Sequence, residues 1–208
     1  MTSTLFASIA VTGFAFAFLH AAMPTHWLPF VLVGRGQNWS ARKTLGVAGL
    51  AALGHVAVTV LAGLAVTAIG LQIGPRLGSV FPYVVGGGVA ALGLFYIVRH
   101  VLRPGPHKVQ VEGYRSDRAA IVGLVTLLAI APSEFIGVYT SNMIHGWTGF
   151  VLLSLVLAVG TSLGMLLFTG LSLAGANRLK LTALDRYESL IVGIALVLLG
   201  VAVMAFKP

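Results

Sequence analysis

The chain contains no cysteine and few charged residues. Its 208 residues include five acidic residues and thirteen lysines and arginines, so only 9% of the residues carry a charge. The absence of cysteine excludes a disulfide framework, a thiolate metal site and dithiol redox chemistry. The scarcity of charge, together with 58% hydrophobic residues and a mean hydropathy of +0.98, excludes a soluble protein folded around one core. The sequence therefore predicts a protein of the lipid bilayer.

Six apolar stretches are long enough to cross a membrane. A helix needs roughly 20 apolar residues to cross about 30 Å of hydrocarbon. The stretches are 9–34, 42–70, 79–102, 119–142, 148–176 and 187–206. Charged residues lie almost entirely between these stretches, and Glu134 is the clear exception. The expected fold is an all-α membrane protein with six transmembrane helices.

Short motifs in the first half of the chain recur in the second. Pro24-Thr25-His26-Trp27 has the same pattern as Pro132-Ser133-Glu134-Phe135. Leu53-Gly54-His55 corresponds to Val159-Gly160-Thr161, and a pair of glycines recurs as well. These glycines are Gly86 and Gly93 in the first half and Gly193 and Gly200 in the second, and the three offsets are 108, 106 and 107. Three matches at nearly one offset indicate an internal duplication.

The duplication divides the chain into two units of three helices. We expect a first repeat at 1–103, a basic cytoplasmic linker at 104–118 and a second repeat at 119–208. Since three is an odd number, the second repeat must enter the membrane in the opposite sense from the first. The repeats are therefore expected to be inverted, an arrangement that many secondary transporters use.

Basic residues are concentrated in alternate connections. Eleven of the thirteen lie in or beside the first, third and fifth connections between the apolar stretches, and the other two are Arg76 and Lys207. Loops rich in lysine and arginine stay in the cytoplasm, so both termini are expected outside the cytoplasm of a bacterial inner (plasma) membrane. This bias accounts for the net charge of +8 without a nucleic acid as a partner.

Prolines are expected to break the first and fourth helices. An interior proline lacks an N–H and presses against the carbonyl four residues earlier, so Pro24 should release the carbonyl of His20, and Pro132 that of Leu128. Released carbonyls at membrane depth are tolerated where they are buried in protein or line a cavity. Each proline alone also fits a simple kink. Two prolines at equivalent depth favour broken helices around a central site.

Four ionisable side chains are placed where they can meet at one depth. His20 and His26 flank Pro24, whereas His55 and Glu134 lie midway along the second and fourth stretches. Three imidazoles and a carboxylate suit a borderline divalent ion such as nickel, cobalt, zinc or iron, bound here as a substrate. Protons compete with metal for imidazole, so affinity is expected to fall below about pH 6.5.

Other interpretations of these residues stay open. His55 alone also fits a hydrogen bond to a neighbouring carbonyl, and Glu134 alone fits a proton relay. Thr25, Ser133 and Thr161 are expected to cap broken helix ends or to bond backbone, in a second shell or along the substrate path. No Ser-His-Asp or paired-carboxylate arrangement is present, so the protein is not expected to be an enzyme.

The remaining glycines and histidines are expected outside the site. Gly86-Gly87-Gly88, and Gly160 with Gly164, are typical of surfaces where helices pack closely. His100, His107 and His145 fall in or beside connections, where we expect them to be solvated.

The histidine motifs resemble those of the nickel/cobalt transporter (NicO-like) superfamily. His20-Ala21-Ala22-Met23-Pro24-Thr25-His26 resembles its signature, a histidine followed after four residues by Asp-His, although Thr25 stands where the family has aspartate. Leu53-Gly54-His55 resembles the Gly-His motif of the family's next helix. The chain is also similar to the broader LysE-type superfamily of exporters with duplicated three-helix units. The resemblance implies a transporter of a divalent transition metal.

Two other functions remain compatible with the sequence. The histidines can be axial ligands of a membrane haem, or the protein can carry an organic or sulfur-containing anion received by broken-helix N-termini. The chain has no nucleotide-binding loop, so ATP coupling within it is not expected. The sequence leaves open which metal is carried, the direction of transport, its energy source, and whether the protein forms a homodimer.

Overall fold

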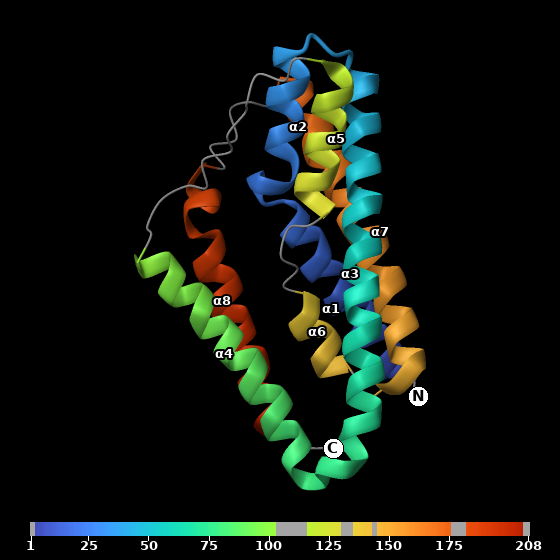
Figure 1. Cartoon of the computed structure of the whole chain (residues 1–208), viewed down its shortest axis with the longest axis vertical. Helices are drawn as coiled ribbons and strands as arrows, with labels where there is room; N and C mark the ends of the chain where they lie inside the picture. The colour runs from blue at the N-terminus through green and yellow to red at the C-terminus, as the bar shows by residue number, and fades with distance from the viewer. Residues whose placement is uncertain (1–2, 103–115, 130–134, 143–144, 176–181, 206–208) are drawn as a thin grey trace.

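The computed structural model describes residues 3–102, 116–129, 135–142, 145–175 and 182–205. Within these ranges every regular element is a helix, and Figure 1 shows their arrangement. The elements are α1 (Ser3–Ala21), α2 (Pro24–Gly36), α3 (Ala41–Leu77), the 3-10 turn η1 (Gly78–Val80), α4 (Phe81–Leu102), α5 (Asp117–Ala129), α6 (Phe135–Asn142), α7 (Gly146–Leu173) and α8 (Thr182–Ala205).

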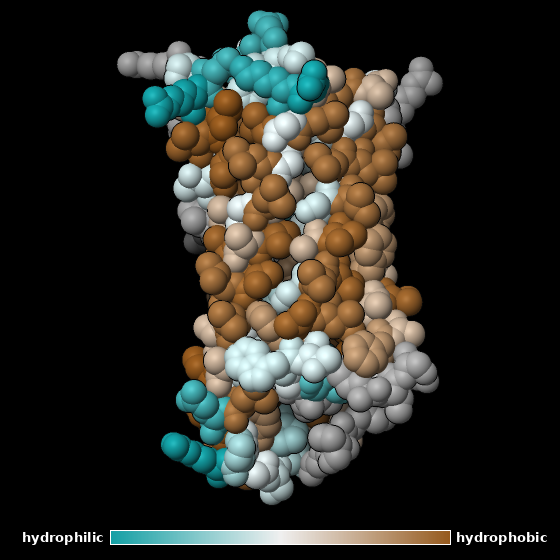
Figure 2. Space-filling model, turned by 90° about the vertical axis from the view of Figure 1, so that its right-hand side faces the viewer, coloured by the Kyte–Doolittle hydropathy of each residue, from teal (hydrophilic) through white to brown (hydrophobic). Residues whose placement is uncertain are grey.

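Helix length and composition identify a membrane protein. The continuous helical stretch Ala41–Leu102 and α7 are long and apolar enough to cross a bilayer, and the bent pair of α1 and α2 adds a third candidate if it forms one span. Large apolar side chains such as Leu53 and Leu61 face outward. Figure 2 shows a broad hydrophobic band between two hydrophilic ends. Such a band matches the surface that lipid requires.

The first apolar stretch consists of two helices separated by a break. α1 and α2 meet at 41°, and Met23 is extended (φ −63°, ψ 135°) because a following proline disfavours the helical conformation. The carbonyl of His20 accepts from the N–H of Met23 at 3.1 Å, and that of Ala22 accepts from the Trp27 indole at 3.0 Å. Pro24 is thus the first residue of α2. The buried carbonyl groups of His20 and Ala22 at the break are both hydrogen-bonded.

The fourth apolar stretch is also represented by two helices. α5 ends at Ala129 and α6 begins at Phe135. Pro132, Ser133 and Glu134 lie outside the described residues. The predictions that concern these three residues therefore remain predictions from the sequence alone.

Four glycines bring α4 and α8 into close contact. A Cβ added at Gly86 would lie 2.5 Å from the carbonyl oxygen of Gly200, and one at Gly93 would lie 2.6 Å from that of Gly193. Residue numbers rise along α4 as they fall along the facing side of α8, so the two helices are antiparallel. The close approach depends on the missing side chains, since the nearest atoms belong to backbone.

Other glycines divide into contacting and open positions. Gly160 and Gly164 pack against α1, where an added Cβ would lie 2.9 Å from Ala17 and 2.7 Å from Ala21, respectively. A Cβ on Gly87 or Gly88 would meet nothing within 4 Å. The expectation of close packing is therefore confirmed for Gly160 and Gly164 and is wrong for Gly87 and Gly88.

The corner between α2 and α3 is tied to the neighbouring helices by polar side chains. The Trp39 indole donates to Asp117 at 2.6 Å, Lys43 forms an ion pair with Asp117, and Arg35 donates to the carbonyl of Ser172 at 3.1 Å. The hydrogen bond from Lys43, and then that from Trp39, lowers the pKa of Asp117. We call this end of the molecule the basic end and the opposite end, where both chain termini lie in Figure 1, the terminal end.

Candidate functional site

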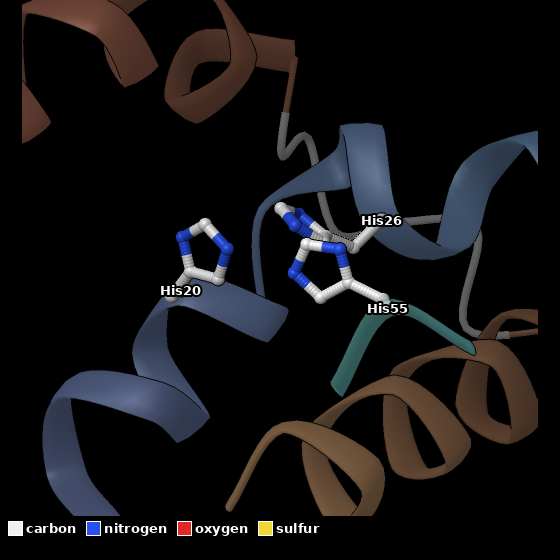
Figure 3. A group of neighbouring side chains, drawn as sticks. All are labelled: His20, His26 and His55. Atoms are coloured by element: carbon white, nitrogen blue, oxygen red, sulfur yellow. The ribbon is translucent and has the colours of Figure 1, made fainter. Parts of the chain in front are cut away.

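Three buried histidines meet where α1 and α2 are separated. His20 lies in the last turn of α1, His26 in the first turn of α2, and His55 in the middle of α3. They are 5%, 6% and 1% exposed, and their nearest ring nitrogens all lie within 4.8 Å of one another. Figure 3 shows the three rings gathered at this break. The structure thus assembles three potential metal ligands from three separate helices.

The break at Pro24 makes this convergence possible. Residues six apart on a regular helix lie about 120° apart around the axis, too far to share a ligand. In the structure the ring centroids of His20 and His26 are 4.2 Å apart. The ring of His55 lies 6.2 Å from the first and 5.8 Å from the second. Interrupting the helix therefore changes two residues on different faces into neighbours.

His55 is oriented by the backbone of α5. Its Nδ1 lies 2.9 Å from the carbonyl oxygen of Leu128. Since a carbonyl can only accept, Nδ1 carries the proton, and Nε2 of the neutral ring carries the lone pair. The hydrogen bond to a neighbouring carbonyl is thus present, and the Leu128 carbonyl has a partner. Hydrogen bonds of this kind orient metal-ligating imidazoles, so the bond is compatible with a ligand role.

Two further side chains contact the histidine cluster. Phe135, at the start of α6, packs against the His20 ring with the ring centroids 4.9 Å apart in an edge-on arrangement. The hydroxyl of Thr25 lies 3.3 Å from Nδ1 of His26. Both contacts restrict ring rotation, so the histidines are held in place by packing as well as by hydrogen bonds.

A small cavity adjoins His55 on its terminal side. Its volume is about 10 Å³, close to the space that one water molecule occupies. It is lined by His55, Val56, Thr59, Val60, Phe135, Tyr139, Leu157 and Thr161. Of the residues expected along the substrate path, Thr161 borders this cavity. Thr59 and Tyr139 were not identified from the sequence, although Thr59 lies four residues after His55 and so shares its helix face.

Some predicted positions lie outside the described residues. These are Glu134, the expected fourth ligand, Ser133 and Pro132 beside it, and His107. His100, which was expected outside the site and solvated, is half-buried and contacts Tyr187, with ring centroids 5.8 Å apart. Among the described residues, the group of side chains that could hold a metal ion consists of His20, His26 and His55.

Comparisons of the chain with protein-family models, with curated proteins and with solved structures find no match. The resemblance of the histidine motifs to nickel/cobalt transporters therefore stays a prediction from the sequence.

Proposed function

We propose that the protein transports a divalent transition-metal ion across a bacterial inner membrane through His20, His26 and His55. The observation that carries the proposal is the convergence of three buried imidazoles whose nitrogens lie within 4.8 Å of one another. Nitrogens bound at about 2.0 Å to one tetrahedral ion lie about 3.3 Å apart, so ion binding needs only small inward shifts of the rings. Ionisable residues at membrane depth are costly, and they mark ion pathways by default.

The donor set indicates the class of cargo. Neutral imidazole binds nickel, cobalt, zinc and iron, whereas calcium and magnesium prefer oxygen ligands. Nδ1–H of His55 is used by the Leu128 carbonyl, which directs the lone pair of Nε2 to an ion. We include Glu134 in the proposal from its sequence position, as the carboxylate that offsets the charge of the cargo.

The contact between α4 and α8 supports inverted repeats. At the offset of 107, Gly86 corresponds to Gly193, and Gly93 corresponds to Gly200. The repeat correspondence therefore maps the contact of Gly86 with Gly200 onto the contact of Gly193 with Gly93, and both contacts are present. Because these corresponding helices are antiparallel, a two-fold axis in the membrane plane would relate them.

A second pair of contacts obeys the same exchange. Gly160 of α7 faces Ala17 of α1, and Gly54 of α3 faces Val125 of α5. Gly160 corresponds to Gly54 at an offset of 106, and Val125 corresponds to Ala17 at an offset of 108. We infer six transmembrane segments in two inverted repeats, with α1 and α2 broken around the site in the first and α5 and α6 as their counterparts. Transporters of this architecture place the substrate between broken helices near the bilayer midplane.

A transport assay with a histidine variant tests the proposal. In cells or proteoliposomes, His26→Ala should reduce the flux of nickel, cobalt or zinc at least tenfold, since even indirect ligand supports are worth about 10- to 100-fold in affinity. His100→Ala is the matched control, because it removes an imidazole outside the cluster. Equal fluxes for His26→Ala and the parent would remove His26 from the mechanism.

An anion carrier is the competing function that one observation favours. α2 begins at Pro24 beside the histidines, and a helix N-terminus attracts anions. A thermal-shift comparison separates the two cargoes: divalent metals should protect the purified protein, and sulfate or carboxylates should not. A haem is less compatible with the geometry, because the adjoining cavity is the size of one water molecule. Purified protein with a haem absorption band would contradict this assignment.

A further inference from the structure

The side of the histidine cluster that faces the basic end is closed by apolar packing. Phe30 and Val33 of α2, Ala48 and Ala51 of α3, and Leu124 of α5 belong to one buried cluster there. We call it the basic-side cluster. Thr44 and Thr169 are also buried toward this end, and the Thr44 hydroxyl bonds to the carbonyl of Ser40 one turn earlier. An ion passing through the basic-side cluster itself would lose its water and meet apolar side chains, which is costly.

The side that faces the terminal end carries buried hydroxyl groups. Thr59 follows His55 by one turn of α3, and Thr161 of α7 borders the same small cavity. Further toward the terminal end, the hydroxyl of Tyr139 in α6 bonds to that of Ser154 in α7 at 2.8 Å. These oxygens can replace part of the water shell of a divalent cation, so the polar route from His55 leads toward the terminal end.

Tyr139 blocks this route, and its ring packs against a glycine of α3. Its side chain is 1% exposed, and its ring packs flat against Gly63, where an added Cβ would lie 2.5 Å from the ring. The phenol ring therefore fills the space between α3 and α7. One hydrogen bond, to Ser154, holds it in this position. A single neutral hydrogen bond has a small net free energy, so such a closure can open reversibly.

The repeat correspondence shows that the two sides differ in chemistry. At an offset of 108, Tyr139 corresponds to Val31, and at the offset of 106 that relates α3 to α7, Ser154 corresponds to Ala48. Both of these residues are buried. The hydroxyl pair on the terminal side thus occupies the positions of a valine and an alanine on the basic side. Apolar side chains satisfy helix packing at the corresponding positions, so the hydroxyls of Tyr139 and Ser154 indicate a polar passage on the terminal side.

We propose that Tyr139 and Ser154 form the gate through which a partly hydrated divalent cation reaches the histidines from the terminal end. The described conformation is closed to the basic end by the basic-side cluster and is separated from the terminal end by this gate. The identity of the cargo rests on the proposed function, whereas the position of the gate does not.

The absence of native cysteine permits a direct accessibility test. Thr59→Cys places a thiol on the cavity behind the gate, and Ala51→Cys places one in the basic-side cluster. Each variant is treated, in vesicles of either orientation, with a small cationic methanethiosulfonate that does not cross membranes. Ser79→Cys, exposed in η1, marks the side of the terminal end. Thr59→Cys should react from that side, and Ala51→Cys should react at least tenfold more slowly from both.

Removing the closing hydrogen bond tests the gate itself. Adding Tyr139→Phe to Thr59→Cys should raise its reaction rate roughly 2- to 10-fold, the range expected for one neutral hydrogen bond. An unchanged rate, faster labelling of Thr59→Cys from the other side, or equal rates for Ala51→Cys would overturn the proposal. Thr161→Cys and Ala52→Cys repeat the comparison if either thiol variant fails to accumulate.

Cobalt chloride separates the gate from the cargo. Protection of Thr59→Cys by cobalt supports both proposals, because an ion on the histidines would occupy the space beside the thiol. The same sided labelling without protection by cobalt, nickel or zinc would support the gate and contradict the metal cargo.

Discussion

The two ring nitrogens of His55 have separate roles at the residue scale. Nδ1 donates to the Leu128 carbonyl in the last turn of α5, which fixes the ring before an ion arrives. Nε2 carries the lone pair that a metal requires. A substitution that removes the whole ring cannot separate packing from binding. Asparagine can separate them, because its amide offers an N–H near the position of Nδ1 and nothing at the position of Nε2.

We therefore predict different outcomes for two variants of His55. His55→Leu leaves the Leu128 carbonyl buried without its donor, which should lower the free energy of unfolding by about 1–3 kcal/mol. His55→Asn should keep that hydrogen bond and lose less than about 1 kcal/mol. Both variants should bind nickel or cobalt at least tenfold more weakly. Thermal unfolding in detergent and titration calorimetry give the two quantities, and parent-like metal binding by His55→Asn would show that Nε2 is not a ligand.

The histidine cluster was more predictable than the hydroxyl pair. His20 and His26 flank a proline in an apolar stretch, so the sequence itself indicates a break that lets them meet. Tyr139 and Ser154 lie on α6 and α7, and neither has a spacing that identifies its partner. Their hydrogen bond depends on how α6 and α7 pack together, and the spacing of residue types along one sequence does not specify this packing.

At the element scale, the contact of α4 with α8 depends on glycines spaced seven apart. Gly86 and Gly93 lie on one face of α4, since seven residues make nearly two turns. Gly87 and Gly88 are turned away by about 100° and 200°, and they point to open space. Composition alone predicted packing at all three consecutive glycines because it does not show which face of a helix meets a neighbour.

This difference gives a matched pair of substitutions. Gly93→Ala places a Cβ 2.6 Å from the carbonyl oxygen of Gly193, so α4 and α8 must separate, at an expected cost of 1–3 kcal/mol in the free energy of unfolding. Gly87→Ala adds the same methyl group to open space and should be neutral or stabilising by up to about 1 kcal/mol. Thermal unfolding in one detergent compares them. A Gly93→Ala variant as stable as Gly87→Ala would contradict the close contact.

Helix positions could be predicted better than helix ends. All six apolar stretches contain helix, and Leu102 ends α4 where the third stretch ends. The second stretch was expected to end near residue 70, yet α3 continues to Leu77 and includes Pro75 in its last turns. Hydropathy falls there while backbone hydrogen bonding continues, so apolar length and helix length are different quantities.

At the scale of the whole molecule, charged side chains lie at the two ends of the long axis. Arg35 and Lys43 lie at the basic end, where hydrogen bonds and an ion pair hold them to neighbouring helices. Figure 2 shows hydrophilic side chains at both ends of the hydrophobic band. Among the described residues, Arg76 lies at the terminal end, whereas Arg35, Arg42, Lys43 and Arg118 lie at the basic end. The imbalance, rather than the presence of charge, is what orients a membrane protein.

The orientation of the protein in the membrane decides the side to which the Tyr139 gate opens. Ser79→Cys lies at the terminal end and Ala41→Cys at the basic end, and both positions are exposed. A membrane-impermeant maleimide should label Ser79→Cys in cells with a permeabilised outer membrane, and Ala41→Cys only after lysis, because the distribution of basic residues predicts that the basic end faces the cytoplasm. The parent, which lacks cysteine, supplies the blank. The reverse pattern would place both termini and the Tyr139 gate on the cytoplasmic side, since helices α1 to α8 fix the two ends relative to each other.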